Sequence, residues 1–375
     1  MRAPVGLVAL VLLLGCKARD SVASVSVPLD AGAESVPAGE ETAIAEIERM
    51  LLAFVEERFD ATALAHRDAH VKTHGCVTAT VTVTASLPET LAVGLFAEPQ
   101  AYPAWIRFSN SADHFASDHR PDGRGMAIKL MNVPGDKALP GHEDGTSHDI
   151  VLINYPVFVV QNAVDYLSFT KDSTTEHPLR FFIQEGRAYH RELKSAEKLA
   201  LQHVVSPVQP TYYSMTPYLF GEGMAIKYGA RPCEKDPRTK RGRGKNYLRE
   251  QLVEDLRTDG ACFELLVQRQ TDPQHMPVED PTVPWPTSAS PYLPVATIEI
   301  PAQTFDTEAR DRMCEYLSFN PWHARAEHRP LGGINRVRKA VYVAVSDLRH
   351  ALDGVEVREP VDHDVETYLD SIGAE

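Results

Sequence analysis

The chain has 375 residues, 43% of them apolar and 24% charged, and its formal net charge is −14 at pH 7. This acidic balance argues against a nucleic-acid partner, because proteins that bind nucleic acids present positive charge to the phosphates. The length allows one large domain or two ordinary ones. Beyond the N-terminus, no segment is apolar for long enough to span a membrane.

The N-terminus has the pattern of an export signal. Met1-Arg2 is followed by an apolar run from Val5 to Leu14, which is too short for a membrane-spanning helix but suits a signal-peptide core. The run ends in Leu-Leu-Gly-Cys at residues 13–16, which resembles the lipobox of bacterial lipoproteins. We therefore expect residues 1–15 to be a signal peptide and Cys16 to carry the lipid. The alternative is an ordinary secretory signal.

Residues 16–40 are predicted to form a flexible tether that begins at the lipidated cysteine, because residues 17–40 contain two prolines and no aromatic residue. Residues 41–375 would form the folded domain, held at a membrane on the periplasmic or cell-surface side. The cysteines after Cys16 are widely spaced and show no C-x-x-C pattern, so a zinc site is not indicated. Some of them could pair in an exported protein, and the sequence leaves the pairing open.

The pattern after the tether is that of an α+β protein. Residues 41–59 have apolar positions at helical spacing, and residues 76–84 alternate small or apolar residues with threonine, as in a half-buried strand. Further strands are expected at 105–108, 126–131, 149–160, 223–228, 262–268 and 295–300, and helices at 163–170, 193–205, 246–259 and 334–352. This order predicts an antiparallel β-barrel with inserted and C-terminal helices.

The predicted helix at 334–352 carries the most informative residues of the chain. Arg338 and Tyr342 are four residues apart and share one face, and Arg349 returns near that face two turns later. Positive charge beside a phenol favours the phenolate. A phenolate is a hard anionic ligand, so this face could hold an iron centre.

Other segments place this pattern in a family context. Six motifs follow one another along the chain: RDAHVKTHG at 67–75, RFS at 107–109, DGRGMAIK at 122–129, NYPVF at 154–158, FNP at 319–321, and the stretch 331–342. In order and rough spacing they resemble the haem catalase superfamily, in particular its short branch without the C-terminal helical domain. That branch includes allene oxide synthases, which act on fatty-acid hydroperoxides. The resemblance covers roughly residues 41–355.

The resemblance implies a set of roles on the distal side of a haem, presumed to be of the b type. His70 matches the histidine that moves a proton between the two peroxide oxygens, and Ser109 matches the serine that orients it. Asn154 is the best match to the asparagine that hydrogen-bonds peroxide. The family normally has two asparagines there, and here Ile153 precedes Asn154.

The remaining roles concern the haem itself. Tyr342 matches the axial tyrosinate and Arg338 its guanidinium partner. The resemblance also implies arginines near the haem propionates or the proximal side and aromatic residues that line the pocket: Arg67, Arg107, Arg349, Phe158 and Tyr166. A neutral imidazole and a phenolate ligand are the groups that heterolytic cleavage of an O–O bond needs.

A competing interpretation comes from His66, His70 and His74, which recur every four residues and on a helix would form a metal-binding face. Gly75 and the strand that follows it argue against a helix there. No H-E-x-x-H pattern supports a metal site.

Three functions remain open. The first is catalase or peroxidase turnover of hydrogen peroxide, which Ala69 before the distal histidine favours, because the allene oxide synthase branch has a threonine there. The second is conversion of an organic hydroperoxide. The third is a haem-binding lipoprotein with little turnover, against which His70 and Ser109 argue. We expect a monomer or homodimer, because the chain mostly lacks the arms through which large catalases assemble.

Overall fold

The computed structural model describes residues 32–173, 181 and 190–374. The predicted signal peptide, Cys16 and residues 17–31 of the predicted tether lie outside the described residues. Within these ranges, no helix is long and apolar enough to cross a membrane.

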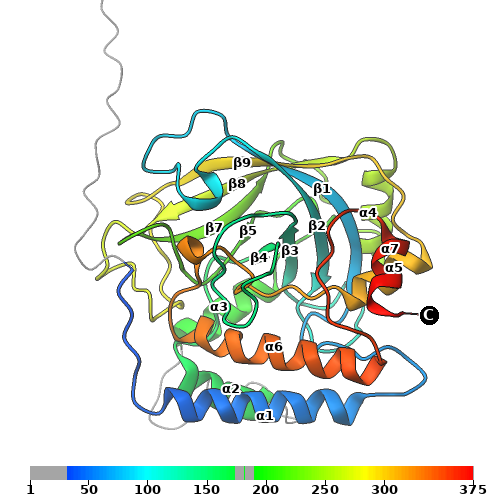
Figure 1. Ribbon diagram of the computed structural model, residues 1–375, viewed down its shortest axis with the longest axis horizontal. Helices are drawn as coiled ribbons and strands as arrows, with labels where there is room; N and C mark the ends of the chain where they lie inside the picture. The colour runs from blue at the N-terminus through cyan, green and yellow to red at the C-terminus, as the bar shows by residue number, and fades with distance from the viewer. Residues whose placement is uncertain (1–31, 174–180, 182–189, 375) are drawn as a thin grey trace, which may run out of the picture.

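Eight strands of the described chain close into an antiparallel barrel, which confirms the predicted fold class (Figure 1). They are β1 (Thr73–Val83), β2 (Ala101–Asn110), β3 (Arg124–Leu130), β4 (His148–Ile153), β5 (Tyr212–Tyr213), β7 (Ala225–Pro232), β8 (Ala261–Arg269) and β9 (Tyr292–Ile300). Their order in space is β5-β4-β3-β2-β1-β9-β8-β7, and the pairing of β5 with β7 closes the ring. The short strand β6 (Tyr218–Leu219) also pairs with β7.

The alternation in β1 explains how the barrel is filled. Val77, Ala79 and Val81 are buried in the barrel core, whereas Thr80 and Thr82 between and after them face the other side and are more exposed. Successive side chains of a strand point to opposite faces, so one face of each strand builds the core. The outer face is then free to pack against helices or to build a site.

Helices cover one side of the barrel. In Figure 1, α1 (Glu40–Arg58) runs alongside α6 (Gly333–Asp353) below the strands, and α2 (Ala163–Ser173) packs against both. Ile47 of α1 and Val341 of α6 are buried in one cluster, because each helix has an apolar stripe at helical spacing. The further helices described are α3 (His190–Ala200), α4 (Tyr247–Thr258), α5 (Glu308–Tyr316) and α7 (Val365–Ile372), with 3₁₀ turns at Gly94–Phe96 and Ala326–His328.

Several local predictions need correction. The strand expected at 149–160 ends at Ile153, where Pro156 removes a backbone donor that the ladder would need. Helices α5 and α7 were not predicted, because each is short. The cysteines whose pairing the sequence left open form two disulfides, Cys76–Cys314 and Cys233–Cys262.

The end of the predicted tether is docked rather than free. Glu34 accepts hydrogen bonds from Arg329 and from the backbone N–H of Gly332, and it forms an ion pair with Arg336. Arg336 also pairs with Glu40 at the start of α1. The segment that enters the fold is thus held at the N-terminal end of α6, the helix that carries Arg338 and Tyr342.

Candidate active site

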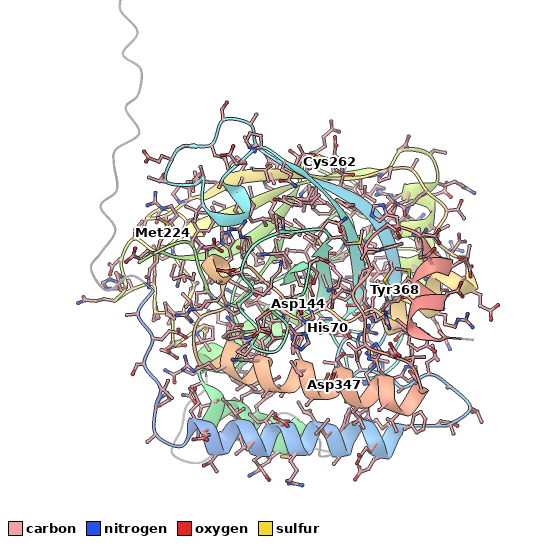
Figure 2. All side chains as sticks on the ribbon, in the orientation of Figure 1. His70, Asp144, Met224, Cys262, Asp347 and Tyr368 are labelled. Atoms are coloured by element: carbon pink, nitrogen blue, oxygen red, sulfur yellow. A yellow bond between two sulfur atoms is a disulfide. The ribbon has the colours of Figure 1, made fainter. Side chains whose placement is uncertain are left out.

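A cavity of about 200 Å³ lies between the outer face of the barrel and helix α6. Arg107 and Ser109 of β2 and Ile153 of β4 line it, whereas Ile106 and Phe108 point to the opposite face and fill the barrel core. Figure 2 shows His70 between the strands and α6. The cavity brings together all the predicted site residues except Asn154: Arg67, His70, Arg107, Ser109, Phe158, Tyr166, Arg338, Tyr342 and Arg349.

His70 has a strained backbone at the wall of the cavity. Its φ of 56° lies in the left-handed region of backbone conformations. Residues other than glycine rarely adopt this conformation, which costs on the order of 1–3 kcal/mol. The Arg107 guanidinium donates a hydrogen bond of 2.8 Å to the His70 carbonyl, and the His70 N–H donates one to the Ser111 carbonyl. These contacts hold the residue in this conformation, and strain held in this way is common at functional sites.

The His70 ring is oriented by its neighbours. Its Nδ1 lies 3.0 Å from the Ser109 hydroxyl oxygen, which leaves the other ring nitrogen for a ligand. A Cβ on Gly125 would lie 2.7 Å from Nδ1 and 2.8 Å from that hydroxyl, so the ring needs a glycine there. Burial, together with the charges of Arg107 and Arg338, lowers the pKa of His70 to about 3. The imidazole is therefore neutral near pH 7 and able to accept a proton.

The structure corrects the placement of Asn154. Its side-chain oxygen accepts a hydrogen bond of 2.7 Å from the Arg124 backbone N–H, and its amide nitrogen donates to Gln202. Ile153 lines the cavity instead. Because side chains alternate across a strand, a shift of one residue moves the amide to the other face. The predicted amide contact to peroxide is therefore absent from this arrangement of the described residues.

Tyr342 and Arg338 lie on the opposite wall, on the face of α6 that the sequence indicated. Arg338 donates a hydrogen bond of 3.2 Å to the Tyr342 phenolic oxygen. Its other amino group contacts the Thr216 hydroxyl at 3.3 Å and the Asn335 side-chain oxygen at 3.2 Å. Burial opposes the charge of Arg338, but the phenols of Tyr342 and Tyr218 outweigh it and raise the pKa of Arg338. The guanidinium is fixed as a charged donor to the phenol.

Three further arginines at the cavity wall form a cationic cluster. Burial and the neighbouring guanidinium of Arg67 lower the pKa of Arg107, and the same two causes lower the pKa of Arg349 to about 9. Nε of Arg107 is buried and has no hydrogen-bond partner among the described residues. An unsatisfied buried donor is costly, so the cluster is suited to an acidic ligand group.

These residues fit a haem group on chemical grounds. The phenolic oxygen of Tyr342 is an iron ligand of the required type. The arginine cluster, with the unpartnered Nε of Arg107, offers donors for carboxylates. Apolar residues such as Ile153 and Phe158 supply walls for a flat hydrophobic ring.

The alternative metal site at the three histidines is not supported. His74 is buried, and its Nε2 lies 2.8 Å from the Asn110 side-chain oxygen, away from the cavity residues. Among the residues that the structure describes, no cluster of His, Cys, Asp and Glu could hold a metal ion.

Comparisons with known proteins agree with the fold. The catalase family model matches residues 24–189, which include the distal residues but not α6. A fungal catalase is 16% identical with a TM-score of 0.62, covering 80% of this chain and 61% of its own. Catalase A from Saccharomyces cerevisiae is also 16% identical with a TM-score of 0.62, covering 83% and 65%. A bacterial catalase is 17% identical with a TM-score of 0.58, covering 86% and 64%. No curated relative matches the sequence.

The fold is therefore similar to the barrel fold of catalases, and residues 24–189 also match the catalase family model in sequence. The predicted resemblance to the catalase superfamily is thereby confirmed. The chain spans between 61% and 65% of the length of the catalases that it matches.

Sequence reasoning missed some residues of the site. Thr216 and Asn335 bind Arg338, and Met215, with a φ of 59°, lines the cavity. Asn335 lies three residues before Arg338, so helical spacing could have identified it. Thr216 and Met215 lie between two-residue strands, and no local pattern marks them.

Proposed function

We propose that the protein is a haem-dependent oxidoreductase that acts on hydroperoxides. The observation that carries the proposal is a neutral histidine, His70, facing an arginine-bound tyrosine, Tyr342, across one cavity. A site that only stores haem needs no proton acceptor held by a strained backbone and a serine. This favours turnover over simple binding.

In the proposed holoprotein, Tyr342 would bind the haem iron and Arg338 would hold the phenol as a charged donor. Arg67, Arg107 and Arg349 would bind the haem carboxylates. The bound haem, presumed to be of the b type, would supply an iron that binds the peroxide oxygen and takes up its oxidising equivalents.

His70 would move the proton that O–O cleavage requires. The free ring nitrogen accepts the proton of the oxygen nearer the iron and donates it to the far oxygen, which leaves as water or as an alcohol. Ser109 keeps the other ring nitrogen engaged, so the ring faces the substrate. A pKa of about 3 keeps His70 in the accepting form throughout the neutral range.

A second candidate substrate class is favoured by Ile153. Hydrogen peroxide carries a hydroxyl group at both ends, and an apolar wall leaves one of them without the amide partner expected from the family. An unsatisfied buried hydroxyl costs about 1–3 kcal/mol. An organic hydroperoxide would instead place a hydrocarbon group against Ile153, where apolar contact is favourable. Hydrogen peroxide remains the first candidate because Ala69 is small and apolar as in catalases.

The location of the protein is proposed from the sequence. The signal and the cysteine at position 16 support an exported lipoprotein on the periplasmic or cell-surface side. The two disulfides are compatible with this, because disulfides persist in oxidising compartments. Labelling with a radioactive fatty acid, with Cys16→Ser as the control, tests the lipid. Globomycin treatment would separate the lipoprotein from an ordinary secretory signal.

The first experiment is an optical spectrum of the protein produced with haem available, beside its Tyr342→Phe variant. We expect a ferric high-spin spectrum that is changed or lost in the variant. Oxygen evolution from hydrogen peroxide would indicate catalase turnover, and preference for cumene hydroperoxide would indicate the second class. Stoichiometric haem with neither activity would leave a haem-binding protein, and the absence of haem would overturn the proposal.

A further inference from the structure

Glu315, in helix α5, is the acidic side chain that contacts the arginine cluster from behind the cavity wall. Its carboxylate forms an ion pair of 2.9 Å with Arg67 and lies 3.9 Å from Arg107. The Thr73 hydroxyl donates a hydrogen bond of 3.0 Å to the same carboxylate, and the Arg349 guanidinium donates to the Glu315 carbonyl. One residue thus contacts all three arginines of the cluster.

The cluster needs such a partner. The side chains of Arg107 and Arg349 are only 4% and 3% exposed, so water does little to screen their repulsion. Asp68 also lines the cavity, but burial raises the pKa of its carboxyl, which disfavours the ionised form. The three arginines lower the pKa of Glu315 despite its burial. Glu315 is thus held as the anion.

The position of Glu315 distinguishes it from a ligand of the cavity. It is not among the residues that line the cavity, whereas Arg67, Arg107 and Arg349 are. The neighbouring Cys314 is joined to Cys76 of β1, and the Cys314 carbonyl accepts a hydrogen bond of 3.1 Å from Arg67. The disulfide therefore fixes the end of α5 against the arginines from outside.

We propose that Glu315 is a positioning residue that keeps the three arginines together and aimed at an acidic group in the cavity. The inference rests on the proposed function, in which that group is a haem carboxylate. Three guanidinium groups against one carboxylate leave positive charge at the wall, and the buried Nε of Arg107 remains as a donor for the ligand. Without the carboxylate, the arginines would separate or lose protons.

The test is a titration of the full-length protein, prepared without haem, with haemin followed by absorbance at pH 7 and pH 9. Glu315→Gln keeps the shape of the side chain and removes its charge. We expect its haemin affinity to fall on the order of 10–100-fold at pH 7, as for other residues that support a ligand-binding group. Asp311→Asn is the matched control, because Asp311 lies on the same helix and pairs with Arg249 instead.

The pH comparison separates positioning from a general structural role. The charged groups that act on Arg349 are Arg67, Glu315, Asp353 and Asp68, and its pKa is about 9. Loss of Glu315 removes a group that raises this pKa, so the fall in affinity between pH 7 and pH 9 should be steeper in the variant than in the wild type. A packing defect would weaken binding equally at both values.

The outcomes are distinct. A wild-type protein that binds no haemin overturns the proposed function and this inference with it. A wild-type protein that binds haemin, beside a Glu315→Gln variant of equal affinity and pH profile, overturns the inference alone. If Glu315→Gln fails to fold, Thr73→Val decides, because it removes the hydroxyl that donates to the carboxylate and accepts from Arg107, and so links the two groups. It should weaken binding in the same direction by a smaller factor, and unchanged affinity would again overturn the inference.

Discussion

The two walls of the cavity differ in how they are built. The proximal wall is one helix, α6, on which Arg338 and Tyr342 are neighbours through helical spacing. The distal wall combines a strained loop at His70, the strand residues Ser109 and Gly125, and the end of β4 at Ile153. A wall on one helix is specified locally, whereas a wall assembled from several segments depends on the register of each.

This difference explains where the chain departs from the catalase pattern. The proximal pair matches the pattern in residue type and spacing. On the distal wall, the apolar Ile153 stands where the family has the first of two asparagines, and the amide of Asn154 is hydrogen-bonded to Arg124 and Gln202 outside the cavity. The distal wall is therefore the part that would set the substrate class. The predictions below test its residues, and one of them extends to two buried histidines elsewhere in the fold.

The largest expected effect comes from His70→Gln. Because His70 is the only proton acceptor that the proposed reaction uses, kcat should fall by about 10²–10⁴-fold, the usual contribution of a general acid–base. The absorption spectrum that the proposed ligation by Tyr342 would give should remain close to that of the wild type. Steady-state oxygen evolution and peroxidase assays measure the loss, with the exposed His114→Gln as control. Retention of turnover in His70→Gln would show that another group moves the proton.

Acid should destabilise the fold strongly. Burial is the first cause of lowered pKa values for His70, to about 3, and for His74 and His328, to about 4. Below pH 6.5 the unfolded chain binds protons that the folded chain excludes, so stability falls as pH falls from about 6.5 towards 4. Each histidine contributes up to about 1.4 kcal/mol per pH unit.

Denaturant unfolding at pH 7, 6 and 5 measures this slope. His74→Gln removes one of these three histidines, at a position outside the cavity. The slope of stability against pH should become smaller by about the contribution of one histidine. An identical slope in His74→Gln would contradict the assignment of a neutral buried ring to that position.

Ile153→Asn should shift the substrate preference. The new amide would face the cavity and offer a hydrogen bond to hydrogen peroxide, worth about 0.5–1.5 kcal/mol, while it removes apolar contact for an organic hydroperoxide. The ratio of kcat/KM for hydrogen peroxide to that for cumene hydroperoxide should rise by roughly 10-fold or more. Val151→Thr is a control that adds a polar group nearby without an amide. No change in the ratio would mean that Ile153 does not contact the substrate.

Much of the fold could be read from the sequence because its signals are periodic. The alternation at residues 76–84 predicted β1, and helical spacing predicted α1 and α6 within one or two residues of their observed starts. Helix α5, with few apolar residues and only nine residues in all, gave no such signal. Glu315 lies on that helix, so no sequence pattern indicated its contact with the arginines.

Residue types and the order of the motifs predicted which residues belong to the site, but not the direction in which each side chain points. All predicted site residues except Asn154 line the cavity. The face to which a strand residue points depends on register, and the motif alone did not show that Ile153, which pairs with Gly125, faces the cavity in place of Asn154. The disulfides and the contacts of Thr216 join segments that are far apart in the sequence, and no local pattern encodes such contacts.

Ser109→Ala should have the smallest effect on the distal wall. It removes the hydroxyl that engages His70 Nδ1 at 3.0 Å, a hydrogen bond worth about 0.5–1.5 kcal/mol, so kcat/KM should fall by about 2–10-fold. Gly125→Ala acts on the same ring through its shape, because the new Cβ would lie under Nδ1. It should lower kcat/KM at least as much as Ser109→Ala. If Ser109→Ala lost as much activity as His70→Gln, the serine itself would take part in proton transfer. The distal wall would then have two proton-transferring groups instead of one oriented histidine.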